Sequence, residues 1–155
     1  MTNKETDLIL LNLINVEKGI AKIYNTFSLK NSFSNPVKTF WKNLAKEEEL
    51  HADMFDKMRQ SYNDTDIQLS LKIDMTKLKQ FVDELNVMLK EVDLSDFDEA
   101  MAYSFGAMIE TKLGEVEFTN RVETNEQKFV KMLKRIEFDT IKHRMILINH
   151  AKGID

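Results

Sequence analysis

The chain has no cysteine, and its 155 residues include only four glycines and one proline. Without cysteine it cannot form disulfides, thiolate metal sites, thiol nucleophiles or haem thioether bonds. Sandwiches and barrels need many more turn-forming residues, so this shortage argues against an all-β fold. A mostly helical domain is the class that these absences leave open.

Neither charge nor hydrophobicity is concentrated in one stretch. The net charge is −4 with both signs interspersed, so there is no basic patch for nucleic acid or an anionic membrane. The apolar run Leu8–Ile14 is too short to cross a bilayer, and it lacks the basic leader and cleavage site of a secretory signal. We therefore expect a cytoplasmic protein with no nucleic-acid or membrane partner.

Apolar residues recur at helical spacing along most of the chain, which predicts four helices of roughly 25 residues, each about 40 Å long. Asn35-Pro36 reads as an N-cap followed by proline in the first turn. Two further starts resemble capping boxes, and Gly153 is a plausible helix stop. The expected long helices cover about residues 4–30, residues 35–61, a stretch opening at Ser95–Asp98 and a stretch opening at Thr124–Gln127.

Short connections join the first two long helices and the last two, while a crossover of about 33 residues separates the pairs. Within it, Met75–Glu91 is expected to form a shorter helix. Two helical hairpins joined by one long crossover are the plan of a ferritin-like four-helix bundle. We therefore predict one all-α domain over residues 1–155.

Glu48 and His51 lie three residues apart and so share one helical face, which Leu44 and Phe55 mark as inward. A carboxylate inside a bundle is costly unless it is paired or bound to a metal ion. A single Glu-x-x-His is weak evidence, because glutamate is frequent in this chain and the spacing can arise by chance.

Two more glutamates and a second histidine also lie on apolar, inward helical faces. Glu17 and Glu110 each stand amid apolar or small residues on the first and third long helices, and His143 has apolar neighbours on the fourth. Taken singly, Glu17 is also compatible with the edge of its apolar stripe, and His143 with a hydrogen-bonded core histidine.

An internal repeat links these residues. Glu17 and Glu110 are 93 positions apart, and His51 and His143 are 92 apart, so each half supplies an inward glutamate and then an inward histidine. Two helices giving Glu and two giving Glu-x-x-His form the ligand plan of a carboxylate-bridged dimetal site. Oxygen and imidazole donors without sulfur suit iron or manganese, and zinc is also compatible.

The segment Leu44-Ala45-x-x-Glu48-x-x-His51-Ala52, with Glu17 and Tyr24 on the first helix, resembles the rubrerythrin branch of the ferritin-like superfamily. The resemblance spans about residues 10–150. It implies a pair of iron ions that react with O2 or hydrogen peroxide, as in a non-haem di-iron oxidase or peroxidase, or that serve in iron handling.

The chain departs from that family in three places. It has no cysteine-ligated rubredoxin-like domain, so a redox reaction would need a separate electron-donor protein. Leu113 stands where the family has a further carboxylate on the third helix. Thr140 stands three residues before His143, where the family has glutamate.

Asp139 is the nearest substitute for that missing glutamate, and it is either a sixth ligand beside His143 or a solvated surface residue. Tyr24 and Tyr103 are either hydrogen-bond donors to the carboxylates or ordinary core residues. Glu117 and Arg121 are expected to pair on their own helix.

The sequence thus predicts a dimetal centre, with iron favoured. Its expected ligands are Glu17, Glu48, His51, Glu110, His143 and Asp139. The alternatives are a non-enzymatic metal-binding or structural bundle whose site is degraded at Thr140, and a helical interaction module without metal. The oligomeric state stays open, with a homodimer as one option.

Overall fold

The computed structural model describes residues 3–62, 66–116 and 122–153, and its described part is mostly helical. The expected Glu117–Arg121 pair lies outside the described residues. The elements in chain order are α1 (Asn3–Ser28), α2 (Asn35–Ser61), β1 (Leu69–Leu71), α3 (Met75–Leu94), α4 (Glu99–Val116), β2 (Val122–Thr124) and α5 (Gln127–Ala151).

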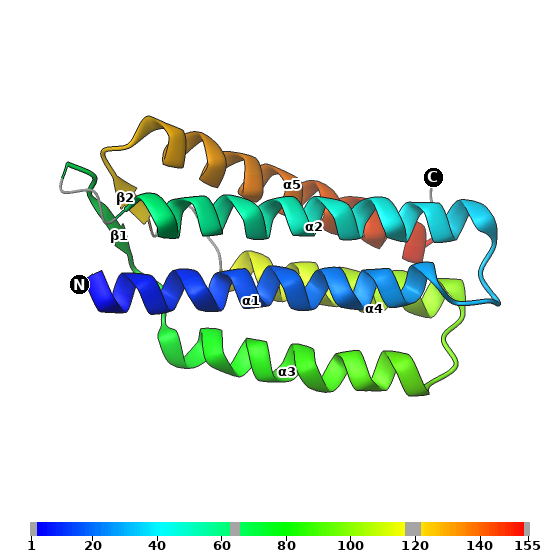
Figure 1. The fold of residues 1–155 in the computed structure, drawn as a ribbon. Helices are drawn as coiled ribbons and strands as arrows, with labels where there is room; N and C mark the ends of the chain where they lie inside the picture. Colours follow the sequence, from blue (N-terminus) through cyan, green and yellow to red (C-terminus); the bar gives the residue numbers. More distant parts are fainter. Residues whose placement is uncertain (1–2, 63–65, 117–121, 154–155) are drawn as a thin grey trace.

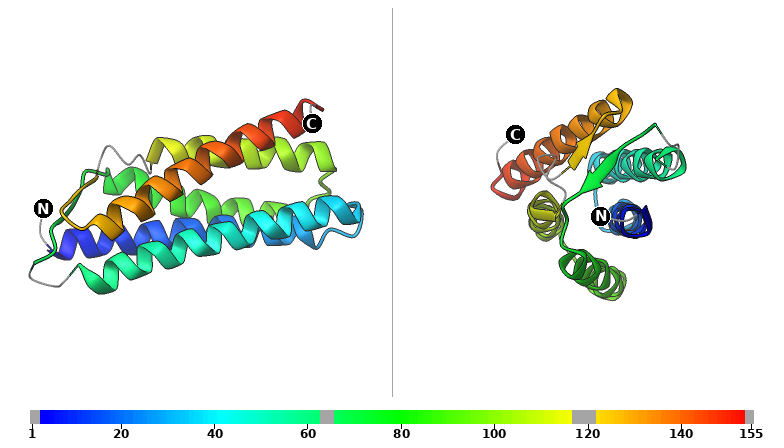
Figure 2. Two further views of the ribbon diagram at one scale, coloured as in Figure 1. Left: turned by 90° about the horizontal axis from the view of Figure 1, so that it is seen from above. Right: turned by 90° about the vertical axis from the view of Figure 1, so that its left-hand side faces the viewer.

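The five helices lie side by side, and each runs opposite to the one before it in the sequence (Figure 1). The main packing pairs are α1 with α2, α4 with α5, and α1 with α3. Viewed from one end, α3 lies outside the group formed by the other four helices (Figure 2). The prediction of an all-α fold is confirmed. None of the described helices is both long and apolar enough to cross a membrane.

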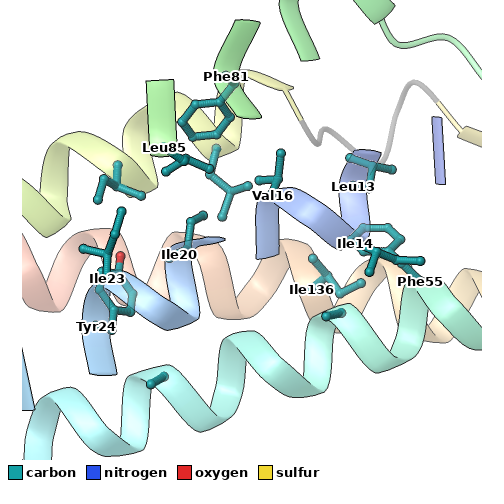
Figure 3. Packing of buried hydrophobic residues seen from close by; sticks show 14 of the residues in the cluster. Leu13, Ile14, Val16, Ile20, Ile23, Tyr24, Phe55, Phe81, Leu85 and Ile136 are labelled. Carbon is teal, nitrogen blue, oxygen red and sulfur yellow. The ribbon is translucent and has the colours of Figure 1, made fainter. Parts of the chain in front are cut away.

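The crossover helix α3 is longer than expected. It has 20 residues against 18 in α4 and ends at Leu94 rather than Glu91. Its buried residues Leu78, Phe81 and Leu85 supply an apolar face that packs against α1. Figure 3 shows Phe81 and Leu85 beside Val16 and Ile20 of α1. Helix α1 is therefore covered on two sides, since its other side faces the interior of the bundle.

The crossover also contains a strand that the sequence did not reveal. Strand β1 pairs antiparallel with β2, with Leu69 opposite Thr124, and ties the α2–α3 connection to the α4–α5 connection. Leu71 is fully buried there. Three-residue strands are too short for an alternating pattern to stand out in a sequence.

The expected capping boxes are displaced along the chain. Helix α4 is capped by Asp98, whose Oδ1 accepts from the Met101 N–H at 2.7 Å. Helix α5 is capped by Glu126, because Thr124 belongs to β2. In both cases a residue inside the four-residue match caps the helix, so the boxes predicted at Ser95 and Thr124 were wrong in register.

At the other predicted boundaries the agreement is closer. The N-cap of α2 is Ser34, one residue before the expected Asn35, and Pro36 lies in the first turn. Gly153 has a φ of +73°, which confirms it as the stop after α5.

Gly106 of α4 allows Trp41 of α2 to enter the core. A Cβ at Gly106 would lie 2.8 Å from Trp41 Cη2 and 3.2 Å from a Leu147 methyl carbon. Trp41 is fully buried, so neither the indole nor Leu147 has room to move aside. At Gly114 on the same helix, an added Cβ would meet nothing within 4 Å.

These two glycines form a matched pair for a stability test. Gly106→Ala should destabilise the fold by about 1–3 kcal/mol through overpacking. Gly114→Ala should be neutral or stabilise it by up to about 1 kcal/mol through helix propensity. Urea unfolding followed by circular dichroism measures both, and equal effects of the two variants would contradict the close packing of Trp41.

Candidate metal centre

Five of the six predicted ligands meet in the interior of the bundle. Glu17 comes from α1, Glu48 and His51 from α2, Glu110 from α4 and His143 from α5, and each is at most 1% exposed. They form two groups, Glu17–Glu48–His51 and Glu48–Glu110–His143, and in each group the candidate ligand atoms all lie within 4.8 Å of one another. Glu48 belongs to both groups, so its carboxylate lies between two potential ion positions.

The two histidines turn the same ring atom inward. His51 Nδ1 lies 3.4 Å from Glu48 Oε2 and 3.7 Å from Glu17 Oε2. His143 Nδ1 lies 2.8 Å from Glu48 Oε1 and 3.5 Å from Glu110 Oε1. The imidazole rings are 6.1 Å apart and nearly parallel. Each histidine thus offers one nitrogen to its own group.

Asp139, the sixth predicted ligand, lies outside both groups. Its Oδ2 is 2.9 Å from His51 Nε2 and 2.9 Å from Arg135 Nε. Asp139 therefore holds the outer nitrogen of a histidine on α2, rather than standing beside His143 on its own helix. A carboxylate in this position fixes the ring orientation and the tautomer that leaves Nδ1 available to a metal.

Glu47 plays the same part for His143, a role that was not predicted from the sequence. Its Oε2 hydrogen-bonds His143 Nε2. The signal was present, because Glu47 and Asp139 are 92 positions apart, the same offset that relates His51 to His143. The internal repeat therefore includes the carboxylates behind both histidines as well as the inner groups.

The repeat is broken at one inner position. Thr140 corresponds to Glu48 under the same offset, and it is buried beside the centre with 6% of its surface exposed. Among the described residues, Thr140 Oγ1 has no hydrogen-bond partner. The centre therefore has three inner carboxylates rather than four. Leu113, which stands where the resembled family has a further carboxylate, is fully buried within the hydrophobic core.

Tyr24 reaches the centre from α1. Its hydroxyl donates to Glu110 Oε1 at 2.7 Å and is fully buried, as expected for a residue that orients a carboxylate. Tyr103, the other tyrosine considered for that role, stacks against Trp41 and His150.

The ionisation of the centre reflects burial and crowding. Burial and the nearby Glu48 charge raise the pKa of Glu110 to about 7, against hydrogen bonds with His143 and Tyr24. Burial opposes ionisation of Glu48 too, but hydrogen bonds with Glu17 and the two histidines hold its pKa well below the usual range. Burial disfavours the charged form of His143, yet the carboxylates of Glu110 and Glu48 raise its pKa to about 11. Positive charge among these carboxylates is strongly favoured.

The donor set fits divalent cations. It combines carboxylate oxygens and imidazole nitrogens without sulfur, which suits iron, manganese or zinc. Glu110 Oε2 is buried and has no hydrogen-bond partner among the described residues, although its Oε1 is held by Tyr24. Such an oxygen loses its bound water on folding, and only a cation or a hydrogen-bond donor can compensate for that loss. The residues present therefore fit a metal-binding role.

Comparison with known proteins adds no assignment: no family model matches the chain, and neither a curated protein nor a solved structure matches it. The interpretation of the centre therefore depends on the residues and distances described above.

The outer carboxylates yield a specific prediction. Asp139→Ala and Glu47→Ala should each weaken binding of one Mn²⁺ ion by about 10- to 100-fold, without changing the number of ions bound at saturation. Titration calorimetry measures both quantities. Glu49→Ala is the matched control, because Glu49 is exposed on the same helix. Loss of one whole ion in Asp139→Ala would instead make Asp139 a ligand.

Proposed function

We propose that the chain is a dimetal carboxylate protein of the ferritin-like kind, similar to rubrerythrins, with iron as the favoured metal. The observation that carries the proposal is the pair of buried Glu/His groups that share Glu48. A single structural ion needs only one such group, whereas a shared carboxylate is typical of a centre that holds two ions.

The arrangement of the helices supports the ferritin-like comparison. The hairpins α1–α2 and α4–α5 are joined by a long connection that includes α3, and α2 and α4 run in the same direction (Figure 1). The candidate ligands follow the plan of such bundles, with Glu on α1 and α4 and Glu-x-x-His on α2. Helix α5 keeps the histidine of that motif and replaces its glutamate with Thr140.

Each residue has a distinct part in this proposal. Glu48 would bridge, Glu17 and His51 would bind on one side, and Glu110 and His143 would bind on the other. Asp139 and Glu47 hold the outer nitrogens of the two histidines, and Tyr24 holds one oxygen of Glu110. An iron pair would supply one-electron redox chemistry toward O2 or hydrogen peroxide. The surrounding core excludes bulk water, since all five inner residues are nearly inaccessible.

Thr140 favours a second candidate, a non-enzymatic protein with one bound metal or a structural role. Four carboxylates would balance the four charges of two divalent ions, but this centre has three inner carboxylates. An uncompensated charge in the interior is costly, so we expect the ion beside His143 to bind more weakly than the ion beside His51.

Metal analysis of anaerobically purified protein distinguishes these functions. Two irons per chain, near-ultraviolet absorption of an oxo-bridged pair after exposure to O2, and a melting temperature that rises with Fe²⁺ or Mn²⁺ are the results we expect. One zinc per chain would support the non-enzymatic alternative. An unchanged melting curve across a saturating metal titration would overturn the metal-binding proposal altogether.

Restoring the missing carboxylate tests the weak position directly. Thr140→Glu should tighten the second ion by at least about tenfold, or roughly 1.4 kcal/mol, because it adds a negative charge beside His143. Thr140→Gln is the matched control, since it has nearly the same size without the charge. Equal second-ion affinities in the wild type and both variants would show that the site is already complete by another route.

A further inference from the structure

The five inner residues of the candidate centre are shielded from solvent, so electrons can reach them only through neighbouring side chains. Its five inner residues are at most 1% exposed, and the chain has no cysteine that could store or pass on electrons. Any electron exchanged between an external donor and this centre must therefore cross the layer of side chains around these residues, in which the partly exposed Glu47 and Arg135 have no oxidisable ring.

A continuous line of rings crosses that layer. The Tyr24 hydroxyl lies 2.7 Å from Glu110 Oε1. The Tyr24 ring centroid is 5.0 Å from that of Trp41, and Trp41 is 5.7 Å from Tyr103 and stacked on it. Tyr103 in turn stacks on His150 at 4.8 Å. Tyr24 and Trp41 are fully buried, whereas Tyr103 and His150 are half-buried, so the line runs from the centre to the surface.

The residue types in this line matter. Tyrosine and tryptophan are the side chains of this chain whose rings lose an electron most easily, and three of the chain's four such rings lie in the line. The fourth, Tyr62, caps the far end of α2. Phe27 also contacts Trp41, but a phenyl ring is much harder to oxidise.

Packing alone does not account for Trp41. Its Nε1–H is buried and has no hydrogen-bond partner among the described residues, although a buried tryptophan usually finds one. An unsatisfied donor is costly, and a purely apolar ring would avoid that cost. Gly106 leaves the space that admits the indole between the two tyrosines.

We infer that Tyr24, Trp41 and Tyr103 form a one-electron relay between the buried centre and the surface near His150. The relay rests on the proposed redox function, because the oxidised metal pair is its oxidant. Its reductant is a one-electron donor, such as a small redox protein, that docks at Tyr103 and His150.

Each transfer in the relay balances. Tyr24 gives one electron to the oxidant and its phenolic proton to Glu110 Oε1, which leaves a neutral tyrosyl radical. Trp41 returns an electron to Tyr24, and the proton moves back from Glu110. Tyr103 then reduces Trp41 and releases its own proton to solvent, and the external donor and solvent restore Tyr103. The net change is one electron moved inward.

The relay can be tested without a redox-active metal, because the same contacts carry an electron outward. The full chain, after chelation and in a second sample with zinc, is illuminated with a ruthenium tris-bipyridine photo-oxidant and persulfate. Frozen samples are examined by electron paramagnetic resonance. Zinc has no redox chemistry, so any radical signal belongs to the protein and not to the metal. We expect a tyrosyl signal in the wild type that Tyr24→Phe removes.

Three further variants decide the route. Trp41→Phe and Tyr103→Phe should each abolish the Tyr24 signal, whereas Tyr62→Phe, the matched control, should leave it unchanged. A role in packing alone would alter the unfolding midpoint but not the radical. Tyr103 is half-buried, so its variant keeps the test valid if Trp41→Phe fails to fold. A Tyr24 signal that survives in folded Tyr103→Phe, or no Tyr24 signal in the wild type, would overturn the relay.

The outcome is separable from that of the proposed function. If metal analysis finds no bound metal but the ring variants behave as expected, the pathway stands and the proposed centre fails. If two metals bind and the Tyr24 radical never forms, the centre stands and the relay fails.

Discussion

The structure depends on burying three carboxylates and two histidines at one level of a helical bundle. Glu17, Glu48 and Glu110 would repel one another in a low-dielectric interior, and only nearby positive charge makes that burial tolerable. The raised pKa values of Glu110 and His143 reflect the same constraint, since a proton bound to either residue reduces the net negative charge of the buried cluster. A cation would compensate the buried negative charge more completely, so the occupancy of the centre and the stability of the fold are linked.

The residues around the buried cluster hold its carboxylates and histidines in place. Asp139 and Glu47 hold the outer nitrogens of the histidines, and Tyr24 holds Glu110. Gly106 leaves room for Trp41 between Tyr24 and Tyr103, so the ring packing next to the centre requires a residue without a side chain at this position of α4. Helix α3 and the small β1–β2 sheet contribute no candidate ligand; α3 covers α1, and the sheet ties two connections together.

The internal repeat explains both the symmetry of the centre and its flaw. Glu17 with Glu110, His51 with His143, and Glu47 with Asp139 make two matched half-sites. Thr140 opposite Glu48 is the single inner mismatch. In the proposed function, Thr140 distinguishes this centre from one with four inner carboxylates, because it leaves the buried cluster with one negative charge fewer.

The sequence by itself determined the helical class, the long helices α1, α2 and α5 and the inward position of the five inner residues, because a 3.6-residue period and charged residues on apolar faces are local properties. It overestimated α4, which has 18 residues. It misplaced the capping boxes and missed two three-residue strands, since such short signals are outweighed by neighbouring contacts. Only the tertiary structure decided that Asp139 serves His51 on another helix, that Glu47 joins the centre, and that α3 packs as a full helix. Each of these depends on which helix faces which across the core, and helix rotation and packing partners are set by the whole chain.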